Sequence, residues 1–394
     1  MRDVVIIGVG QTPVSENWEK SLREIAGEAV FLALHDASMP AVDAIYVGNM
    51  LSGLVSRQEN LGAMISDWVG LKYCEAIKVE AACGSGGAAF RHALMAVGSG
   101  DVESALAVGV EKMTETRSSS TASALATAAD ADYEIVHGLS FVAINALVMQ
   151  RYMHTYGWQH QHFAPFSINA HANAVENPYA RLREPISEKD YLKARMIADP
   201  INLLDASPIG DGAAAVIVLP HEHFKNKYGQ LMDKDPFGRP LVTVRASASA
   251  TDTLAVHSRR DPLWLSAAED SARKAYSQAG VTPQDIDLFE LHDAFSIMSA
   301  LSLEACGFAE RGQAPSLGLD GEISPRGKIP ICTRGGLKAR GHPVGATGVY
   351  QVVEVVQQLR GEAGANQVEN ARLGMAQNIG GSGATVITHI LQVV

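Results

Sequence analysis

The sequence predicts an α/β fold made of two copies of one unit, in which helices pack on the faces of a sheet. A strand, an amphipathic helix, a proline-containing turn and a second strand follow one another near the N-terminus, and the same order recurs after residue 239. In each copy a glycine-rich turn then opens another helix, and a further strand follows. Alternating strands and helices are typical of parallel sheets with helices on their faces.

The first copy begins with the apolar strand VVIIG at residues 4–8. The next segment has apolar side chains at helical spacing from Leu22 to Ala37, which predicts a helix with one buried face. The later elements of this copy are the strand AIYVGN, a helix over residues 88–97 that opens after the glycine-rich turn at Cys83, and the strand SALAVGV.

The second copy begins with the strand LVTVRAS, and a helix with one apolar face runs from Leu265 to Ala279. The turn AGVTPQDID leads into the strand LFELHD, as the turn SMPAVD does before AIYVGN. After His342 the turn GATG opens a helix over residues 349–359, and the strand LGMAQNI follows. Cys83 and His342 therefore occupy matching positions. A pseudo-two-fold arrangement should bring them face to face at the carboxyl ends of strands, where α/β folds place ligands.

Residues 114–205 do not fit the repeat. They contain the low-complexity run SSSTASALATAADAD, a segment with the pattern of a helix over residues 141–156, and a polar stretch rich in Asn and His. We interpret them as an insertion that covers the site, the alternative being a purely structural excursion. The predicted domains are an N-terminal half (1–113 and 206–238), the insertion, and a C-terminal half (239–394).

Composition narrows the class of function. Hydrophobic residues make up 47% and charged residues 19% of the 394 residues, as in an ordinary globular enzyme. The formal net charge of −11 argues against a nucleic-acid or anionic-membrane partner. No apolar stretch approaches the roughly 20 residues of a membrane span. The run VVIIGVG is too short for a signal peptide, so we expect a cytoplasmic protein.

The common motifs for metal, nucleotide and serine-hydrolase sites do not fit. The four cysteines form no CxxC pair and no HExxH is present, so we expect no metal site and reduced thiols. GVGQTP has a proline where a dinucleotide-binding turn needs its third glycine, and GLKARGH lacks the P-loop lysine. CGSGG lacks the first glycine of a nucleophile elbow.

One cysteine and two histidines remain as candidates for chemistry: Cys83 in AACGSGG, His292 in ELHDAFS and His342 in KARGHPVGATG. A thiolate is favoured at a helix N-terminus by unpaired N–H groups and the helix dipole. A neighbouring histidine can take the thiol proton, and carbonyl chemistry needs N–H donors at the developing oxyanion. Each residue alone has a structural explanation, but their placement at the ligand ends of two repeats favours a catalytic site.

The chain resembles a thiolase over essentially its whole length. The matching stretches are VEAACGSGGAA, HDAF, GGLKARGHPVGATG and NIGGSGATV, in that order, together with LLDASPIGDGAAAVIVLP. HDAF is closer to the sterol-carrier-protein type and the archaeal acetoacetyl-CoA thiolases than to the NEAF of degradative thiolases. The resemblance implies a duplicated thiolase fold, with two βαβαβαββ halves in a five-layered α-β-α-β-α arrangement and a lid insertion.

The resemblance also implies roles for residues. Cys83 would be the nucleophile that carries the acyl group, and His342 would deprotonate it and help to bind the thioester oxygen of the second substrate. His292 would complete that oxyanion hole. The backbone N–H groups of Cys83 and Gly380 would form the other hole.

Three residues would contact coenzyme A in a protein of this family. Ser247, in RASAS, stands where thiolases contact the pantetheine arm. Gly381 and Ser382 belong to the terminal motif and are assigned to substrate binding. These are expectations from the family pattern alone.

The sequence departs from the family pattern at the base for the α-carbon. Thiolases commonly hold a second cysteine in a CxG motif, where this chain has Asn378, and sterol-carrier-type enzymes can supply one from HDCF, where it has Ala294. His342, His292 or a bound water must then remove the α-proton. Cys332, in CTRGG, is interpreted as a buried structural thiol rather than a base.

The resemblance implies a C-acyltransferase that uses coenzyme A thioesters and no permanently bound cofactor. Its reaction would be acyl transfer to Cys83 followed by Claisen condensation with acetyl-CoA, or the reverse thiolysis. The alternatives are a biosynthetic ketosynthase or a weakly catalytic docking subunit. Expected partners are a second copy (a homodimer or dimer of dimers), and a hydroxymethylglutaryl-CoA synthase with a small zinc-ribbon/OB-fold protein, with no nucleic acid and no membrane.

Overall fold

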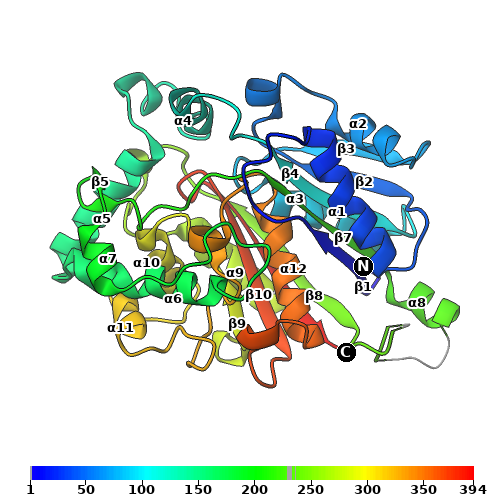
Figure 1. The fold of residues 1–394 in the computed structure, drawn as a ribbon. Coiled ribbons are helices and arrows are strands. Elements are labelled where there is room, and N and C mark those ends of the chain that lie inside the picture. The colour runs from blue at the N-terminus through cyan, green and yellow to red at the C-terminus, as the bar shows by residue number, and fades with distance from the viewer. Residues whose placement is uncertain (1, 229–232, 236) are drawn as a thin grey trace.

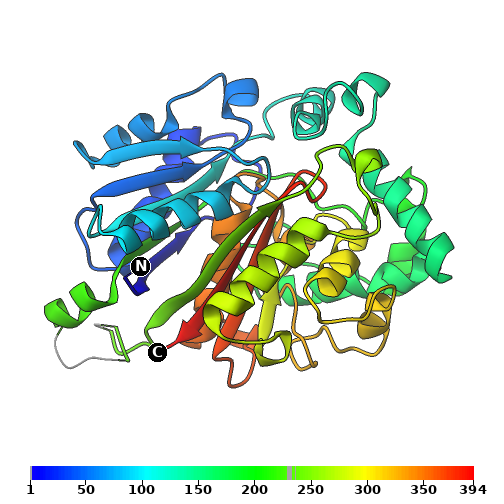
Figure 2. The ribbon, with the colours of Figure 1, turned by 180° about the vertical axis from the view of Figure 1, so that it is seen from behind.

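The computed structural model describes residues 2–228, 233–235 and 237–394, and in this part of the chain the core is a nine-stranded sheet of order β3-β2-β4-β7-β1-β8-β11-β10-β9. Helices cover both faces of the sheet (Figures 1 and 2). The strands are β1 (Val4–Gln11), β2 (Ala44–Gly48), β3 (Glu75–Val79), β4 (Ala105–Glu111), β7 (Gly212–Pro220), β8 (Val242–Thr251), β9 (Leu288–Glu290), β10 (Leu373–Gly380) and β11 (Thr385–Val393).

The sheet consists of two matching halves joined through β1 and β8, which pair at Val5↔Thr243 and Ile6↔Val242. The order β2-β4-β7-β1 in the first half recurs as β9-β10-β11-β8 in the second. Where the first half has β3 beside β2, the second has a parallel bridge between Phe289 and Ile331. The predicted duplication is therefore confirmed strand by strand.

The expectation of parallel sheets is wrong for most of the strand pairs. Among the described residues, β2 pairs in parallel with β3 and β4, and β10 with β9, whereas β1, β7, β8 and β11 pair antiparallel with their neighbours. For β10 and β11 the reason is the connection between the strands. The turn at residues 381–384 joins β10 directly to β11, and so short a link permits only antiparallel pairing.

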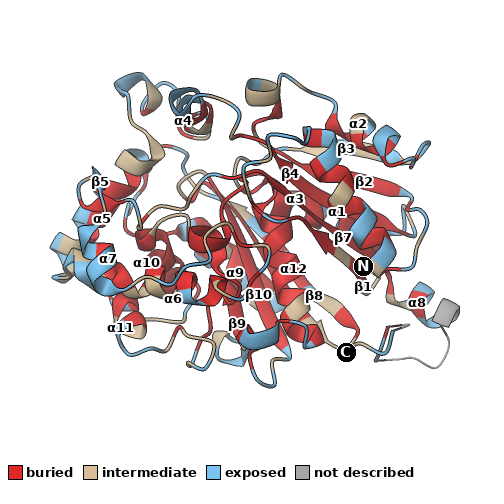
Figure 3. Ribbon diagram, viewed as in Figure 1, coloured by how far each residue is buried: buried red, intermediate tan, exposed pale blue. Residues whose placement is uncertain are grey.

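Five layers result, as the family resemblance implies, because the two halves of the sheet lie on either side of a middle helix layer. The middle layer is α3 (Ser85–Ser99) and α12 (Thr347–Arg360), which contact each other and strands of both halves. On the outer faces, α1 (Leu22–Asp36) packs on the first half and α9 (Ser266–Ala279) on the second. Every residue of α12 except Gln357 is buried, whereas α1 buries one face (Figure 3).

The insertion packs at the side of the second half, to the left in Figure 1. The helix predicted over 141–156 coincides with α5, which contacts α10, and the low-complexity run forms α4. The domain boundaries stay predictions, and residues 229–232 and 236 of the segment 206–238 lie outside the described residues.

The remaining helices are α2 (Leu61–Trp68), α4 (Ser118–Ala126), α5 (Phe141–Tyr156), α6 (Ala164–Ala174), α7 (Glu188–Lys193), α8 (His221–Tyr228), α10 (Ser296–Ala305) and α11 (Ala314–Leu319). A separate two-stranded sheet is formed by β5 (Met196–Ala198) and β6 (Ile201–Asn202).

Candidate active site

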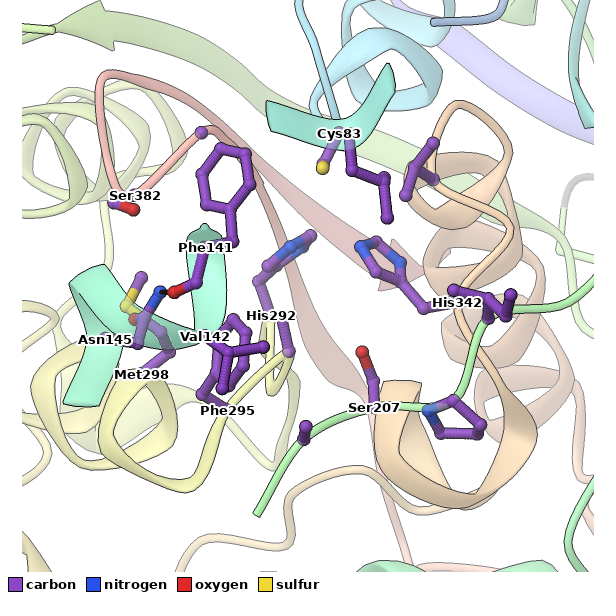
Figure 4. Close-up of a pocket in the computed structure, with 17 residues that line it drawn as sticks. Cys83, Phe141, Val142, Asn145, Ser207, His292, Phe295, Met298, His342 and Ser382 are labelled. Carbon is purple, nitrogen blue, oxygen red and sulfur yellow. Dashed lines mark hydrogen bonds between the residues drawn. The ribbon is translucent and has the colours of Figure 1, made fainter. Parts of the chain in front are cut away.

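Cys83, His292 and His342 line one cavity of about 180 Å³ (Figure 4). Cys83 lies just before α3, His342 just before α12, and His292 just after β9, so both halves of the fold contribute. The walls are mainly apolar, and several come from the insertion, as expected of a segment that covers the site: Leu125, Phe141 and Val142. Phe295 and Met298 of the α10 region complete the apolar wall.

A strained turn presents Cys83. Ala82 has φ +51°, a left-handed conformation that L-residues adopt only when their surroundings enforce it. Ser85 supplies this constraint, because its Oγ accepts from the Ala81 N–H at 2.9 Å and donates to the Ala82 carbonyl at 2.6 Å. The polar residue of the CGSGG run thus fixes the turn, and the run ends in the first turn of α3.

Glycines let α3 and α12 meet backbone to backbone. A Cβ on Gly348 would lie 2.2 Å from the Gly87 nitrogen and 2.3 Å from Asn378 Oδ1, and one on Gly86 would lie 2.9 Å from the Gly345 carbonyl oxygen. Both glycine-rich turns are therefore needed for the same close approach. This contact brings the loops that carry Cys83 and His342 to one cavity.

The Cys83 thiol is held in its neutral form. Burial and the charge of Glu111 raise its pKa to about 12, against the lowering effect of the N–H groups of Gly381 and of Cys83 itself. The backbone N–H groups favour the thiolate as expected of this position, but burial outweighs them. Attack by Cys83 requires a base that takes its proton.

His342 presents a bare nitrogen to the cavity. Thr347 Oγ1 donates its hydroxyl hydrogen to the Pro343 carbonyl (3.1 Å) and lies 2.7 Å from His342 Nδ1, so it accepts the Nδ1–H. The proton of the neutral ring is then on Nδ1, and Nε2 has a free lone pair. Burial lowers the pKa of His342 well below its ordinary value, as does the neighbouring His292. In this state His342 is an acceptor of protons. With no hydrogen on Nε2 it has no donor for the thioester oxygen of the second substrate, so the oxyanion role expected of it does not fit this tautomer.

His292 has the opposite tautomer. The backbone N–H of Ile379 donates to His292 Nδ1 at 3.4 Å, so this nitrogen carries the lone pair and Nε2 carries the hydrogen. Burial, with Arg340 nearby, lowers the pKa of His292 to about 3, so the ring is neutral above that pH. The two rings stand 5.1 Å apart between centroids at 84°. One ring is arranged to accept a proton and the other to donate a hydrogen bond.

Two buried carboxyl groups that the sequence analysis did not single out anchor the loops of the site. Glu111 accepts from the N–H groups of Met50 (3.1 Å), Leu51 (3.1 Å) and Gly345 (3.0 Å), and burial raises its pKa to about 7 in spite of these donors. Asp293 accepts from the Leu337 N–H at 2.7 Å, in the turn that leads to His342. In both cases the sequence feature that could have identified the residue is an acidic side chain at the end of an apolar strand.

Not all candidate residues reach the cavity. Gly381, Ser382 and Ala294 line it. Ser247 does not, since it accepts a hydrogen bond from Arg91 and lines a separate cavity. Gly380 is not among the described residues that line the cavity, so its oxyanion role stays a prediction.

Cys332 is a buried thiol outside the cavity. Its backbone has φ +49°, and burial together with Asp293 raises its pKa well above the ordinary value. Among the described residues, Cys83 is the only cysteine that lines the cavity. The interpretation of Cys332 as structural is therefore supported, and the identity of the α-carbon base stays a prediction.

Two further classes of site were searched for across the described ranges. No group of three or more His, Cys, Asp or Glu residues there could hold a metal ion. None of the helices in those ranges is long and apolar enough to cross a membrane.

Comparison with known proteins identifies the family. Residues 4–222 match the model of the thiolase N-terminal domain, and 248–393 match the thiolase C-terminal domain-like model. An acetyl-CoA acetyltransferase of Methanothermobacter thermautotrophicus is 44% identical over 99% of each chain, and Homo sapiens sterol carrier protein 2 is 33% identical over 98% of this chain and 72% of that protein. The solved Ltp2-ChsH2(DUF35) aldolase shares the fold (TM-score 0.83, 24% identity, 99% of this chain and 98% of that one).

The chain therefore belongs to the thiolase family. It is an enzyme of the acyltransferase class, and the predictions of fold class and enzyme class are both confirmed. The alternatives of a ketosynthase or a docking subunit are not favoured by these relatives.

Proposed function

We propose that this thiolase transfers an acetyl group from acetyl-CoA to Cys83 and joins it to a second acetyl-CoA, or catalyses the reverse thiolysis of acetoacetyl-CoA. The observation that carries the proposal is that Cys83, His292 and His342 line one cavity although they come from three segments of the chain. The 44% identity to an acetyl-CoA acetyltransferase supports acetyl as the acyl group.

In the first half-reaction, Cys83 Sγ attacks the thioester carbonyl carbon while His342 Nε2 takes the thiol proton. The N–H groups of Cys83 and Gly380 would stabilise the oxyanion. The N–H groups of Cys83 and of Gly381, the residue after Gly380, interact with the Cys83 thiol, which supports an oxyanion hole in this region. The bond to the coenzyme A sulfur breaks, and the leaving thiolate takes the proton from His342. The product is acetyl-Cys83 and free coenzyme A.

In the second half-reaction, the Nε2–H of His292 donates to the thioester oxygen of the second acetyl-CoA. This donation stabilises the negative charge that forms when the α-proton leaves. The α-carbon then attacks the acetyl-Cys83 carbonyl, and the Cys83 thiolate departs and recovers a proton. Acetoacetyl-CoA is the product.

The enzyme would use coenzyme A thioesters as substrates, with no permanently bound cofactor, in a cytoplasmic homodimer or dimer of dimers. We also propose a small zinc-ribbon/OB-fold protein and a hydroxymethylglutaryl-CoA synthase as partners.

The test is intact-protein mass spectrometry after incubation with acetyl-CoA. The wild type should gain one acetyl mass that free coenzyme A removes, and Cys83→Ala should gain none. Cys332→Ser is the matched control and should be acetylated like the wild type. An adduct retained in Cys83→Ala, or mapped to Cys332, would overturn the assignment. Acetylation without solvent-deuterium exchange at C2 of acetyl-CoA, even with the partner proteins added, would favour a ketosynthase instead.

A further inference from the structure

Asn378 stands where thiolases commonly hold a second cysteine, and its side chain is buried beside the active-site cavity. Its Oδ1 accepts a hydrogen bond from the Gly87 backbone N–H at 3.0 Å. Because that N–H is an unambiguous donor, the orientation of the amide is fixed. Asn378 Nδ2 therefore faces His292 Nδ1, at 3.3 Å.

The amide thus adds a second donor to the nitrogen that already faces the Ile379 N–H. With two donors on Nδ1, the alternative tautomer of His292 would place its hydrogen against both N–H groups in a buried site. Such a contact loses the hydrogen bonds and leaves buried donors without acceptors, which is costly for each group. The Nε2–H tautomer is therefore the stable one.

We propose that Asn378 is a positioning residue that restricts His292 to donating a hydrogen bond and leaves His342 as the imidazole base of both half-reactions. This inference rests on the proposed function and extends it to the α-carbon base that the missing cysteine leaves open. In the second half-reaction, His342 Nε2 takes the α-proton of acetyl-CoA, and the electron pair of the broken C–H bond forms the new carbon–carbon bond. His342 then returns the proton to the departing Cys83 thiolate, so no further acid or base is required.

The substitution that tests this role is Asn378→Asp, because it keeps the shape of the side chain. One carboxylate oxygen still accepts from Gly87, but the other now faces His292 Nδ1 and demands a donor. His292 must then move its hydrogen to Nδ1, so Nε2 loses the hydrogen that serves the oxyanion. One added proton, on the carboxylate or on the ring, restores the Nε2–H.

The carbon–carbon step of Asn378→Asp should therefore be slower by about a hundredfold at pH 8, the usual effect of losing one oxyanion donor, and should recover as the pH falls. Among the described residues, the charged and titratable groups around His292 include Arg340, His342 and the Cys83 thiol on the same cavity, all unchanged in this variant. Acetylation of Cys83, measured in a single turnover, should remain within a few-fold of the wild type. Asn173→Asp is the matched control: it also places a carboxylate at a buried asparagine, but outside the cavity, and should leave the pH profile of the wild type unchanged.

A second measurement is independent of turnover. The ring-nitrogen ¹⁵N chemical shifts of His292, assigned by comparison with His292→Gln, should show hydrogen on Nε2 in the wild type and on Nδ1 in Asn378→Asp at pH 8. An unprotonated Nε2 in the wild type, or a carbon–carbon step in Asn378→Asp with the pH profile of the wild type, would overturn the inference. Failure of the wild type to be acetylated would instead refute the proposed function and leave the tautomer result standing.

Discussion

The N-terminal and C-terminal halves use the same local structure to present two different chemical groups. In the first half, the glycine-rich turn before α3 presents the nucleophile Cys83. In the second half, the turn before α12 presents His342, the proposed base. Because α3 and α12 lie side by side between the two halves of the sheet, these turns meet. A duplicated fold therefore brings a nucleophile and a base together from opposite ends of the sequence.

The two halves differ in how their surroundings fix these turns. α12 is enclosed along almost its whole length, whereas α3 leaves Met95 43% exposed, and the edge strand β3 beside it leaves Ile77 49% exposed. In the insertion, α5 and α6 contact α10 of the second half, whereas α4 contacts residues 52–56 of the first half. The helix behind the base is therefore more fully enclosed than the helix behind the nucleophile. Equivalent substitutions should lower the free energy of unfolding more in the second half than in the first.

The largest expected effect comes from alanine at the two glycines of the helix contact. Gly348→Ala should lower the free energy of unfolding by about 3 kcal/mol or more, because its Cβ meets backbone nitrogen and Asn378 at 2.2–2.3 Å. Gly86→Ala, whose nearest contact is 2.9 Å, should cost less. Denaturant unfolding measures both. Gly280→Ala, at φ +70° in open space, gives the cost of backbone strain alone. An equal loss in both variants would refute the difference between the halves.

The next effect concerns the protonation of Cys83. Since its pKa is raised to about 12, the thiolate fraction should increase about tenfold per pH unit up to that value. Alkylation of Cys83 by iodoacetamide, which requires the thiolate, should therefore rise about a hundredfold between pH 8 and 10. Peptide mapping in a Cys74→Ser background isolates the signal, because Cys74 is also partly exposed. A rate that levels off near pH 7 would mean that a thiolate–imidazolium pair exists at rest.

A smaller effect is expected at Thr347, which fixes the tautomer of the base. Thr347→Val keeps the shape but removes the oxygen that accepts the Nδ1–H of His342. The Nε2–H tautomer then becomes competitive, and acetylation of Cys83 should slow by about tenfold, within the usual contribution of general-base catalysis. Thr347→Ser retains the hydroxyl and should restore the rate. If Thr347→Ser is as slow as Thr347→Val, packing rather than the hydrogen bond positions the ring.

The sequence predicted the elements whose pattern is local. The helical spacing from Leu265 to Ala279 anticipates α9 (Ser266–Ala279) within a residue, and the glycine-rich turns indicate which helices meet. The antiparallel strands were missed because apolar composition does not reveal the direction of a strand. The tautomers could not be predicted, since Ile379 and His292 are 87 positions apart and only the folded chain brings the donor to the ring.

The central claim is that the two imidazoles perform separate tasks, with His342 as base and His292 as hydrogen-bond donor. The most direct test measures single-turnover acetylation of Cys83 and the following carbon–carbon step in His342→Ala and His292→Ala. His342→Ala should slow acetylation itself, because the neutral thiol loses the group that takes its proton. His292→Ala should leave acetylation nearly intact and slow the second step by about a hundredfold or more. Equal loss of acetylation in both variants would contradict the claim.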